Sequence, residues 1–157
     1  MSSSNAQLIH DYAEVVWNQG RTDQLGRFMH EDVRAYGLGG EPPLVGLAKL
    51  TEETARWRSM YSEATMNVVR TVAEEERVAW QWQLIGTIAD LGMLMPNMRQ
   101  LAREVPQIRQ ISVDGMSIST IRDGKIAEEV TQSDIAEFLK QIGYPTPQTP
   151  QDGSPAA

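Results

Sequence analysis

The sequence predicts an α+β fold in which a curved antiparallel sheet packs on three N-terminal helices. Two long segments, 61–87 and 115–143, carry the period-two alternation of β-strands, and turn-forming residues interrupt each of them. The acidic run Glu74–Glu76 marks the first chain reversal, and Arg122–Gly124 marks the second. Each segment therefore forms a hairpin, and a helix over Ala136–Ile142 closes the second segment.

Three helices are expected ahead of these hairpins. Residues 5–19 place apolar side chains on one helical stripe that ends before Gly20. A short helix at Thr22–Met29 and a strand at Asp32–Tyr36 follow it. After a loop rich in Gly and Pro, the spacing of apolar residues from Leu47 onward is again helical.

The length of 157 residues suits a single domain, expected over 1–144. A Met-rich insertion at about 88–110 separates the hairpins, where Pro96 can open a short helix. Such a helix would either cover a pocket as an adaptable apolar lid or pack on the surface. The composition of 145–157 predicts a disordered tail.

Composition and charge exclude several classes of partner. The formal net charge is -7 and the pI is about 4.8, which opposes binding to nucleic acid or to an anionic membrane. The chain has no cysteine and only two histidines, so thiol chemistry is excluded and we expect no metal and no other cofactor. No basic leader or long apolar run is present, and we expect a cytoplasmic protein.

Four segments of the chain resemble the SnoaL-like polyketide cyclases, a branch of the nuclear transport factor two and ketosteroid isomerase superfamily. They are VVWNQGRTDQL, PLVG, VAEEERVAWQW and IRDGKIAEEVTQSD. The resemblance implies a cone-shaped α+β barrel, usually a dimer, with a deep pocket between sheet and helices. It also implies a hydrophobic, oxygenated small molecule as ligand.

The resemblance indicates which positions match the family's acid and base, and in this sequence those positions carry neutral side chains. A His or Asp and a second Asp of the cyclases correspond to Ser117 and Thr131, and the Asp of the isomerase branch falls near Tyr36. An Arg and an Asp of the limonene-epoxide-hydrolase branch correspond to Gln81 and Gln83. These five residues are predicted to bind substrate, because neutral hydrogen-bond donors can stabilise a developing oxyanion.

A hydroxyl cannot act alone as a general base, so another group must supply one. Glu129 shares a strand face with Thr131 and is one candidate, although a solvated surface carboxylate is the simpler interpretation. Asp114 is the second candidate, although its position before Gly115 is typical of a turn or bulge. Trp57 and Tyr61 either stack on a planar ligand or pack in the core.

The strand that contains Val78–Ile85 allows two opposite orientations. Its alternation taken alone buries Trp80 and Trp82 and leaves Gln81 and Gln83 in water. The resemblance implies the reverse, with the amides in the pocket and the indoles at a dimer interface. We expect the orientation that the resemblance implies, and therefore a homodimer through the face that carries the two indoles.

Three functions remain open from the sequence. The first is an enzyme of the cyclase, aldol-condensation or isomerase type that acts on a hydrophobic oxygenated substrate through an enolate-like state. The second is a dimeric protein that binds a small molecule without turnover, which the missing acid and base favour. The third is an epoxide hydrolase, which needs a matched acid and base.

Overall fold

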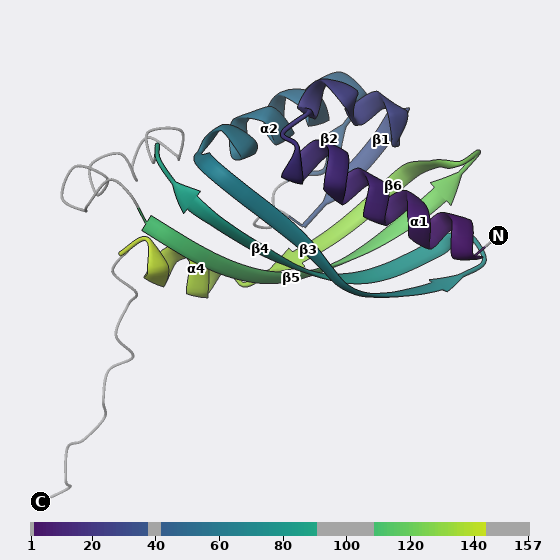
Figure 1. The fold of residues 1–157 in the computed structure, drawn as a ribbon. Coiled ribbons are helices and arrows are strands. Elements are labelled where there is room, and N and C mark those ends of the chain that lie inside the picture. Colours follow the sequence, from purple (N-terminus) through teal and green to yellow (C-terminus); the bar gives the residue numbers. More distant parts are fainter. Residues whose placement is uncertain (1, 38–41, 91–108, 144–157) are drawn as a thin grey trace, which may run out of the picture.

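The computed structural model describes residues 2–37, 42–90 and 109–143, in which helices cover one face of a six-stranded sheet (Figure 1). The first helical region is α1 (Ser2–Tyr12), which runs directly into a π-helical turn, η1 (Ala13–Asn18). A 3-10 helix, η2 (Thr22–Arg27), and two strands, β1 (Met29–Tyr36) and β2 (Leu44–Val45), come next. The remaining elements are α2 (Leu47–Ser59), β3 (Tyr61–Glu74), β4 (Arg77–Ile88), β5 (Arg109–Arg122), β6 (Lys125–Ser133) and α4 (Ile135–Gln141).

The strand order is β2-β1-β6-β5-β4-β3, and both predicted hairpins are present. Glu75 and Asp123 adopt the positive φ angles, 51° and 50°, that tight hairpin turns require. One difference from the predicted antiparallel sheet is that β1 pairs with β6 in parallel, so the sheet is mixed. These two strands lie far apart in the chain, so no short turn forces an antiparallel pairing. The sheet is curved and does not close into a barrel, because β2 and β3 remain edges.

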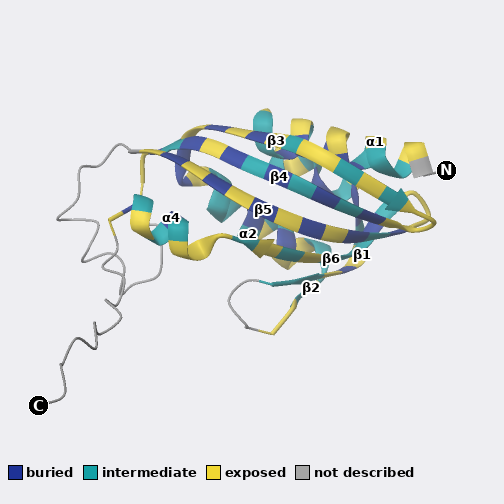
Figure 2. Ribbon diagram, turned by 90° about the horizontal axis from the view of Figure 1, so that it is seen from below, coloured by how far each residue is buried: buried dark blue, intermediate teal, exposed yellow. Residues whose placement is uncertain are grey.

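The orientation of β4 differs from the one that we expected. Trp80 and Trp82 are buried inside the chain, with exposed fractions of 3% and 7%, and Tyr12 of α1 meets the Trp80 ring edge-on at 6.2 Å between centroids. Gln81 and Gln83 lie on the opposite face, which none of the described helices covers and which Figure 2 shows from below. The predicted dimer interface through the two indoles is therefore wrong. Helices of the same chain bury the indoles, and two Trp side chains bury more apolar area than two amides.

A close contact between Gly115 and Trp82 fixes where the indole lies. Gly115 is the cross-strand neighbour of Trp82, and a Cβ atom at Gly115 would fall 2.1 Å from Trp82 Cζ2. The indole therefore lies flat across β5 in space that only glycine leaves open. This placement brings its ring nitrogen to the next inward-facing residue of β5.

Two predicted segments fall on parts of the chain that the structure does not describe. Most of the Met-rich insertion, 91–108, and the predicted tail, 145–157, lie outside the described residues. The predicted single domain over 1–144 stays a prediction. Within the described ranges, no helix combines the length and apolarity needed to cross a lipid bilayer.

Candidate functional site

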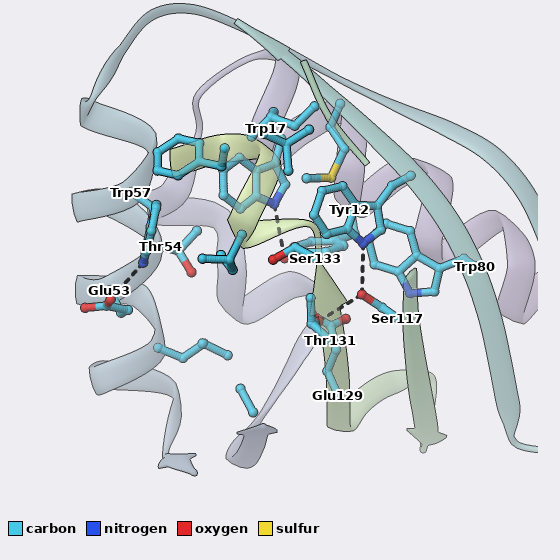
Figure 3. Close-up of a pocket in the computed structure, with 18 of the residues that line it drawn as sticks. Tyr12, Trp17, Glu53, Thr54, Trp57, Trp80, Ser117, Glu129, Thr131 and Ser133 are labelled. Atoms are coloured by element: carbon cyan, nitrogen blue, oxygen red, sulfur yellow. Dashed lines mark hydrogen bonds between the residues drawn. The ribbon is translucent and has the colours of Figure 1, made fainter. Parts of the chain in front are cut away.

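A cavity of about 160 Å³ lies between the inner face of the sheet and the helices α1, α2 and α4 (Figure 3). Most of its wall is apolar or aromatic. The lining includes Tyr12, Tyr36, Glu53, Trp57, Trp82 and Glu129. An engineered apolar cavity of about 150 Å³ holds benzene, so this cavity matches a ligand of about one ring. Such a cavity with few polar groups is typical of a small-molecule site.

Glu129 of β6 brings a carboxyl group into this wall from the sheet side. Burial raises its pKa from 4.5 to about 7, and hydrogen bonds from the hydroxyls of Ser119 and Thr131 oppose that rise. Desolvation dominates because it disfavours the charged carboxylate. Near neutral pH Glu129 is therefore a mixture of acid and carboxylate, the state that suits a group that both takes and gives a proton.

Two buried chains of hydrogen bonds lead to Glu129. In one, Trp80 Nε1 donates to Ser119 Oγ at 3.1 Å, and Ser119 Oγ donates to Glu129 Oε2 at 2.9 Å. In the other, Trp82 Nε1 donates to Ser117 Oγ at 3.1 Å, and Ser117 Oγ lies 2.9 Å from Thr131 Oγ1. An indole N–H can only donate, so each serine hydroxyl accepts from its tryptophan. Ser119 then donates to Glu129, whereas either hydroxyl of the Ser117–Thr131 pair can be the donor, and Thr131 is the one that bonds to Glu129.

A second carboxyl, Glu53, lies on the α2 side of the cavity. The hydrogen bond from the Arg56 guanidinium lowers its pKa, so this group stays ionised. Trp57 Nε1 also donates to Glu53 Oε1 at 2.9 Å. The Arg56 guanidinium lies over the Trp57 ring, 5.5 Å from its centroid, which is within cation–π range. The two carboxyls of the wall thus differ in protonation because only Glu53 has a cationic partner among the described residues.

The buried phenols of Tyr12 and Tyr61 do not act as bases. Burial, with a smaller contribution from the negative charge of Glu129, raises the pKa of Tyr12 above its usual range. Burial also raises the pKa of Tyr61 to about 12. Both groups therefore keep their protons at neutral pH.

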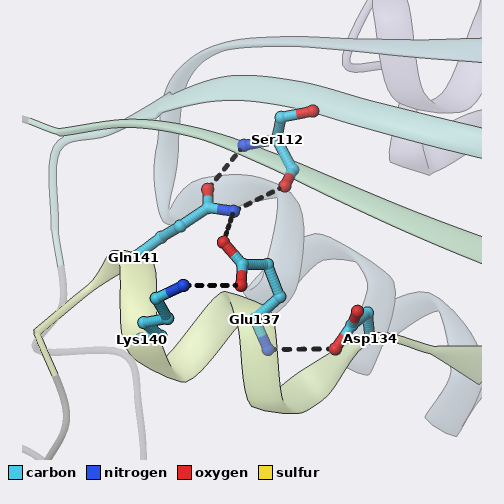
Figure 4. A network of polar contacts seen from close by, with 5 residues as sticks. All are labelled: Ser112, Asp134, Glu137, Lys140 and Gln141. Atoms are coloured by element: carbon cyan, nitrogen blue, oxygen red, sulfur yellow. Dashed lines mark hydrogen bonds and ion pairs between the residues drawn. The ribbon is translucent and has the colours of Figure 1, made fainter.

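Helix α4 closes one side of the cavity through Phe138, and a polar network fixes it on the sheet (Figure 4). Gln141 accepts a hydrogen bond from the backbone N–H of Ser112 at 2.8 Å and donates to its carbonyl oxygen at 2.9 Å. Asp134 caps the helix by accepting from the N–H of Glu137 at 3.0 Å. The Gln141 amide therefore replaces a neighbouring strand at Ser112, a residue of β5 beyond the end of the β6 pairing.

The family model of the SnoaL-like polyketide cyclases matches residues 7–142 of this chain. The chain belongs to the SnoaL-like polyketide cyclase family. No relative is found among curated protein sequences.

Solved structures show the same fold at low sequence identity. TsrD from Streptomyces laurentii has a TM-score of 0.73 and 20% identity, and the match covers 92% of this chain and 98% of TsrD. A SnoaL-like polyketide cyclase homologue from Jannaschia sp. CCS1 has a TM-score of 0.74 and 17% identity over 92% of this chain and 95% of its own. AclR from Streptomyces galilaeus, named as a candidate hydroxylase, has a TM-score of 0.74 and 15% identity over 93% and 100% of the two chains. These likenesses support the fold alone.

Six of the nine predicted site residues lie in the wall of this SnoaL-like cavity. They are Tyr36, Trp57, Tyr61, Ser117, Glu129 and Thr131. The other three lie on the outer face of the sheet, where Gln83 pairs with Asp114 and Gln81 pairs with Met116. Asp114 is an exposed mid-strand residue, so the turn expected there is not found and Asp114 lies away from the cavity, while its catalytic role stays a prediction. Alternation along β5 decides this outcome, since Asp114 and Ser117 are an odd number of residues apart.

Sequence reasoning missed several residues of the wall. Glu53 was not considered, although it lies one helical turn before Trp57 and so on the same face of α2. Ser119, which lies behind the wall as a hydrogen-bond partner of Glu129, was also missed, although it lies two residues after Ser117 on the same strand face. Trp80 and Trp82 were assigned to the wrong face. Within the described ranges, no cluster of three or more His, Cys, Asp or Glu side chains has the arrangement of a metal site.

Proposed function

We propose that this SnoaL-like protein is an enzyme of the isomerase or cyclase type in which Glu129 transfers a proton on a small, largely apolar substrate. One observation carries the proposal: a carboxyl group with a pKa of about 7 opens into an aromatic cavity of ligand size. Perturbed carboxyls in such cavities are frequent acid-base catalysts. Glu129 takes the place of the family's acid and base, whose positions hold Ser117 and Thr131 here.

The proposed chemistry needs one acidic C–H next to a carbonyl group of the substrate. The Glu129 carboxylate takes that proton, and the C–H electron pair forms the enolate. Return of the proton from Glu129 to another carbon completes an isomerisation, whereas attack of the enolate carbon on a second carbonyl closes a ring. The hydroxyls of Tyr36, Thr54 and Ser133 line the wall and are the candidate donors to the enolate oxygen.

Binding without turnover is the second candidate function. It is favoured by Ser117, which is 2% exposed and already bonded to both Trp82 and Thr131. Such a hydroxyl stabilises the cavity wall and has little capacity left to contact a reacting group. Hydration of an epoxide has no comparable support, because Gln81 and Gln83 lie outside the cavity.

A base-sensitive probe separates these two functions. Nitrobenzisoxazole is a compact bicyclic compound that opens when a base removes its one ring C–H proton: the N–O bond breaks and a coloured cyanonitrophenolate forms. We expect the wild-type protein to accelerate this reaction and Glu129→Gln to lose about 100-fold or more of the acceleration. The control is Glu128→Gln, the same change one residue earlier on the opposite strand face. Equal rates in Glu129→Gln and wild type would exclude Glu129 as the base.

Binding can be followed independently of turnover. All four tryptophans of the chain line the cavity, so intrinsic fluorescence reports on its contents. A fluorescence change with the probe in Glu129→Gln, without turnover, would show that the cavity is intact and that the proton acceptor is missing. Binding without acceleration in the wild-type protein would support the second candidate.

We also propose that the protein is a homodimer, through the outer face of the sheet. Val72, Ala79, Ile118 and Val130 form one apolar row across the four strands β3 to β6. Val72 is 68% exposed and Ile118 is 50% exposed, and an exposed apolar row on an uncovered sheet face is typical of a protein interface. A second copy presents the same row, so a two-fold axis pairs the two rows.

Sedimentation equilibrium tests this dimer. We expect a dimeric wild type, a monomeric but folded Ile118→Glu variant, and no change for Val45→Glu, which is 47% exposed on β2. A monomeric wild type would exclude the dimer. The predicted cytoplasmic location stays a prediction.

A further inference from the structure

The charged groups of the cavity wall are all acidic. Among the described lining residues only Glu53 and Glu129 carry an ionisable carboxyl, and no Lys, Arg or His lines the cavity. The chain as a whole has a formal net charge of -7, which also favours the approach of cations. A carboxylate or phosphate ligand would therefore enter without a cationic partner and would face two acidic side chains.

Two arginines, Arg56 and Arg58, contact residues of the wall and leave the negative character of Glu129 unchanged. Arg56 pairs with Glu53 and lies over the Trp57 ring, so it compensates Glu53. Arg58 donates to the backbone carbonyls of Trp17 and Tyr61 at 2.8 and 3.2 Å. Within the described residues Glu129 forms no ion pair, and its own partners are hydroxyl donors. A cationic ligand can therefore still neutralise the charge of Glu129, whereas Arg56 already compensates that of Glu53.

Aromatic rings form most of the remaining surface. Eight aromatic side chains line the cavity: Tyr12, Trp17, Tyr36, Trp57, Tyr61, Trp80, Trp82 and Phe138. The negative faces of such rings attract a desolvated cation, and Trp does so most strongly. Figure 3 shows Trp80, Ser117 and Thr131 close to Glu129 on the sheet side, with Glu53 and Trp57 across the cavity on α2.

We propose that the substrate of this cavity is a small ring-containing amine that also carries the reacting carbonyl group, bound as a cation with its positive charge beside Glu129 and its apolar body toward Trp57 and Phe138. This inference rests on the proposed function and narrows its substrate class. The aromatic wall and the Glu129 carboxylate together stabilise the positive charge of an ammonium or iminium group. An iminium also acidifies a neighbouring C–H bond, as a carbonyl does, so the assignment is compatible with proton removal by Glu129.

Three ring compounds of similar size distinguish the effect of ligand charge on affinity from the effect of ligand shape. Benzylamine is cationic at neutral pH, benzyl alcohol is neutral and benzoate is anionic. Titration at pH 7, followed by tryptophan fluorescence and by calorimetry, should give the order benzylamine, benzyl alcohol, benzoate. We expect a preference of about tenfold for benzylamine over benzyl alcohol. Benzyltrimethylammonium, a cation that cannot donate an N–H bond, should also bind more tightly than benzyl alcohol.

Two substitutions, Glu129→Gln and Glu128→Gln, test whether the cationic group of the ligand lies beside Glu129. Glu129→Gln should reduce the preference for benzylamine to about threefold or less while benzyl alcohol binds as before, because only the ion-pair attraction is removed. Glu128→Gln, on the outer face, should keep the wild-type preference. Equal affinities of wild type for benzylamine and benzyl alcohol would overturn the proposal and leave the small-molecule site in place. Tighter binding of benzoate would also overturn it. Absence of binding by all four compounds would contradict both this inference and the proposed function.

Discussion

The hydroxyl of Ser119 lies between Trp80 and Glu129, and its bond to Glu129 Oε2 is 2.9 Å long. Ser119 is fully buried, so its own hydroxyl is shielded from water. Because Trp80 donates to Ser119, the hydroxyl proton of Ser119 is directed to Glu129. The sheet thus stabilises the carboxylate form of a group that burial would otherwise keep protonated.

Removing the Ser119 hydroxyl tests the hydrogen-bond chain from Trp80 to Glu129. In Ser119→Ala the pKa of Glu129 should rise above its wild-type value, because a hydrogen bond to the carboxylate is lost. The Trp80 N–H also loses its partner, at a cost of about 1–3 kcal/mol in the free energy of unfolding. Urea unfolding measures the second effect. Ser112→Ala, an exposed serine of the same strand, should leave the stability of the protein nearly unchanged.

The raised pKa of Glu129 makes stability depend on pH. Below about pH 4.5 both the folded and the unfolded state bind the proton, and the contribution of Glu129 is fully present. As the pH rises toward about 7 the unfolded state loses this proton first, so the free energy of unfolding falls. The expected fall is on the order of 3 kcal/mol, at about 1.4 kcal/mol per pKa unit.

Thermal unfolding of wild type and Glu129→Gln between pH 4.5 and 7 isolates that contribution. Glu53 has a lowered pKa and acts with the opposite sign at lower pH, but both proteins share it. The difference between the two stability curves should therefore shift steadily in favour of Glu129→Gln as the pH rises. A constant difference would contradict burial as the cause of the raised pKa.

Gly115→Ala should displace the Trp82 indole. The added Cβ would lie 2.1 Å from the ring, and neither the strand nor the indole has space to move without loss of packing. We expect a loss of about 3 kcal/mol in the free energy of unfolding and a shift of the tryptophan emission. Asp114→Ala, the neighbouring residue on the outer face, should be tolerated. A stable Gly115→Ala variant with unchanged emission would show that the indole does not need this space.

Gln141→Ala should loosen α4 without unfolding the sheet. The variant loses two hydrogen bonds to the backbone of Ser112, worth roughly 1 kcal/mol each. Amide hydrogen exchange at Ser112 should become faster, whereas exchange in β4 should stay slow. Lys140→Ala, an exposed change on the same helix, is the matched control.

Much of the fold could be predicted from local patterns. The turns at Glu75 and Asp123 and the helices before the sheet follow from residue chemistry that acts over short distances. The parallel pairing of β1 with β6 could not be predicted in this way, because it joins segments about 90 residues apart in the chain. Glu129 was found because strand alternation links it to Thr131.

The face of β4 was predicted wrongly for a specific reason. Alternation taken alone places Trp80 and Trp82 inside, as the structure has them, but we expected the opposite orientation. The resemblance was given more weight and placed Gln81 and Gln83 in the cavity. Side chains alternate between the two faces of a strand. An error of one position in matching β4 to the family therefore moves every side chain of the strand to the opposite face. The wall therefore contains the indoles, and Asp114 moves outside with the amides.

The most direct test of this account is an NMR titration of the Glu129 side-chain carboxyl, assigned by comparison with Glu129→Gln. We predict a midpoint at about pH 7 for Glu129. A midpoint near 4.5 for Glu129 would mean that the carboxyl is solvated and ionised at neutral pH, and the proposed proton transfer would lose its basis.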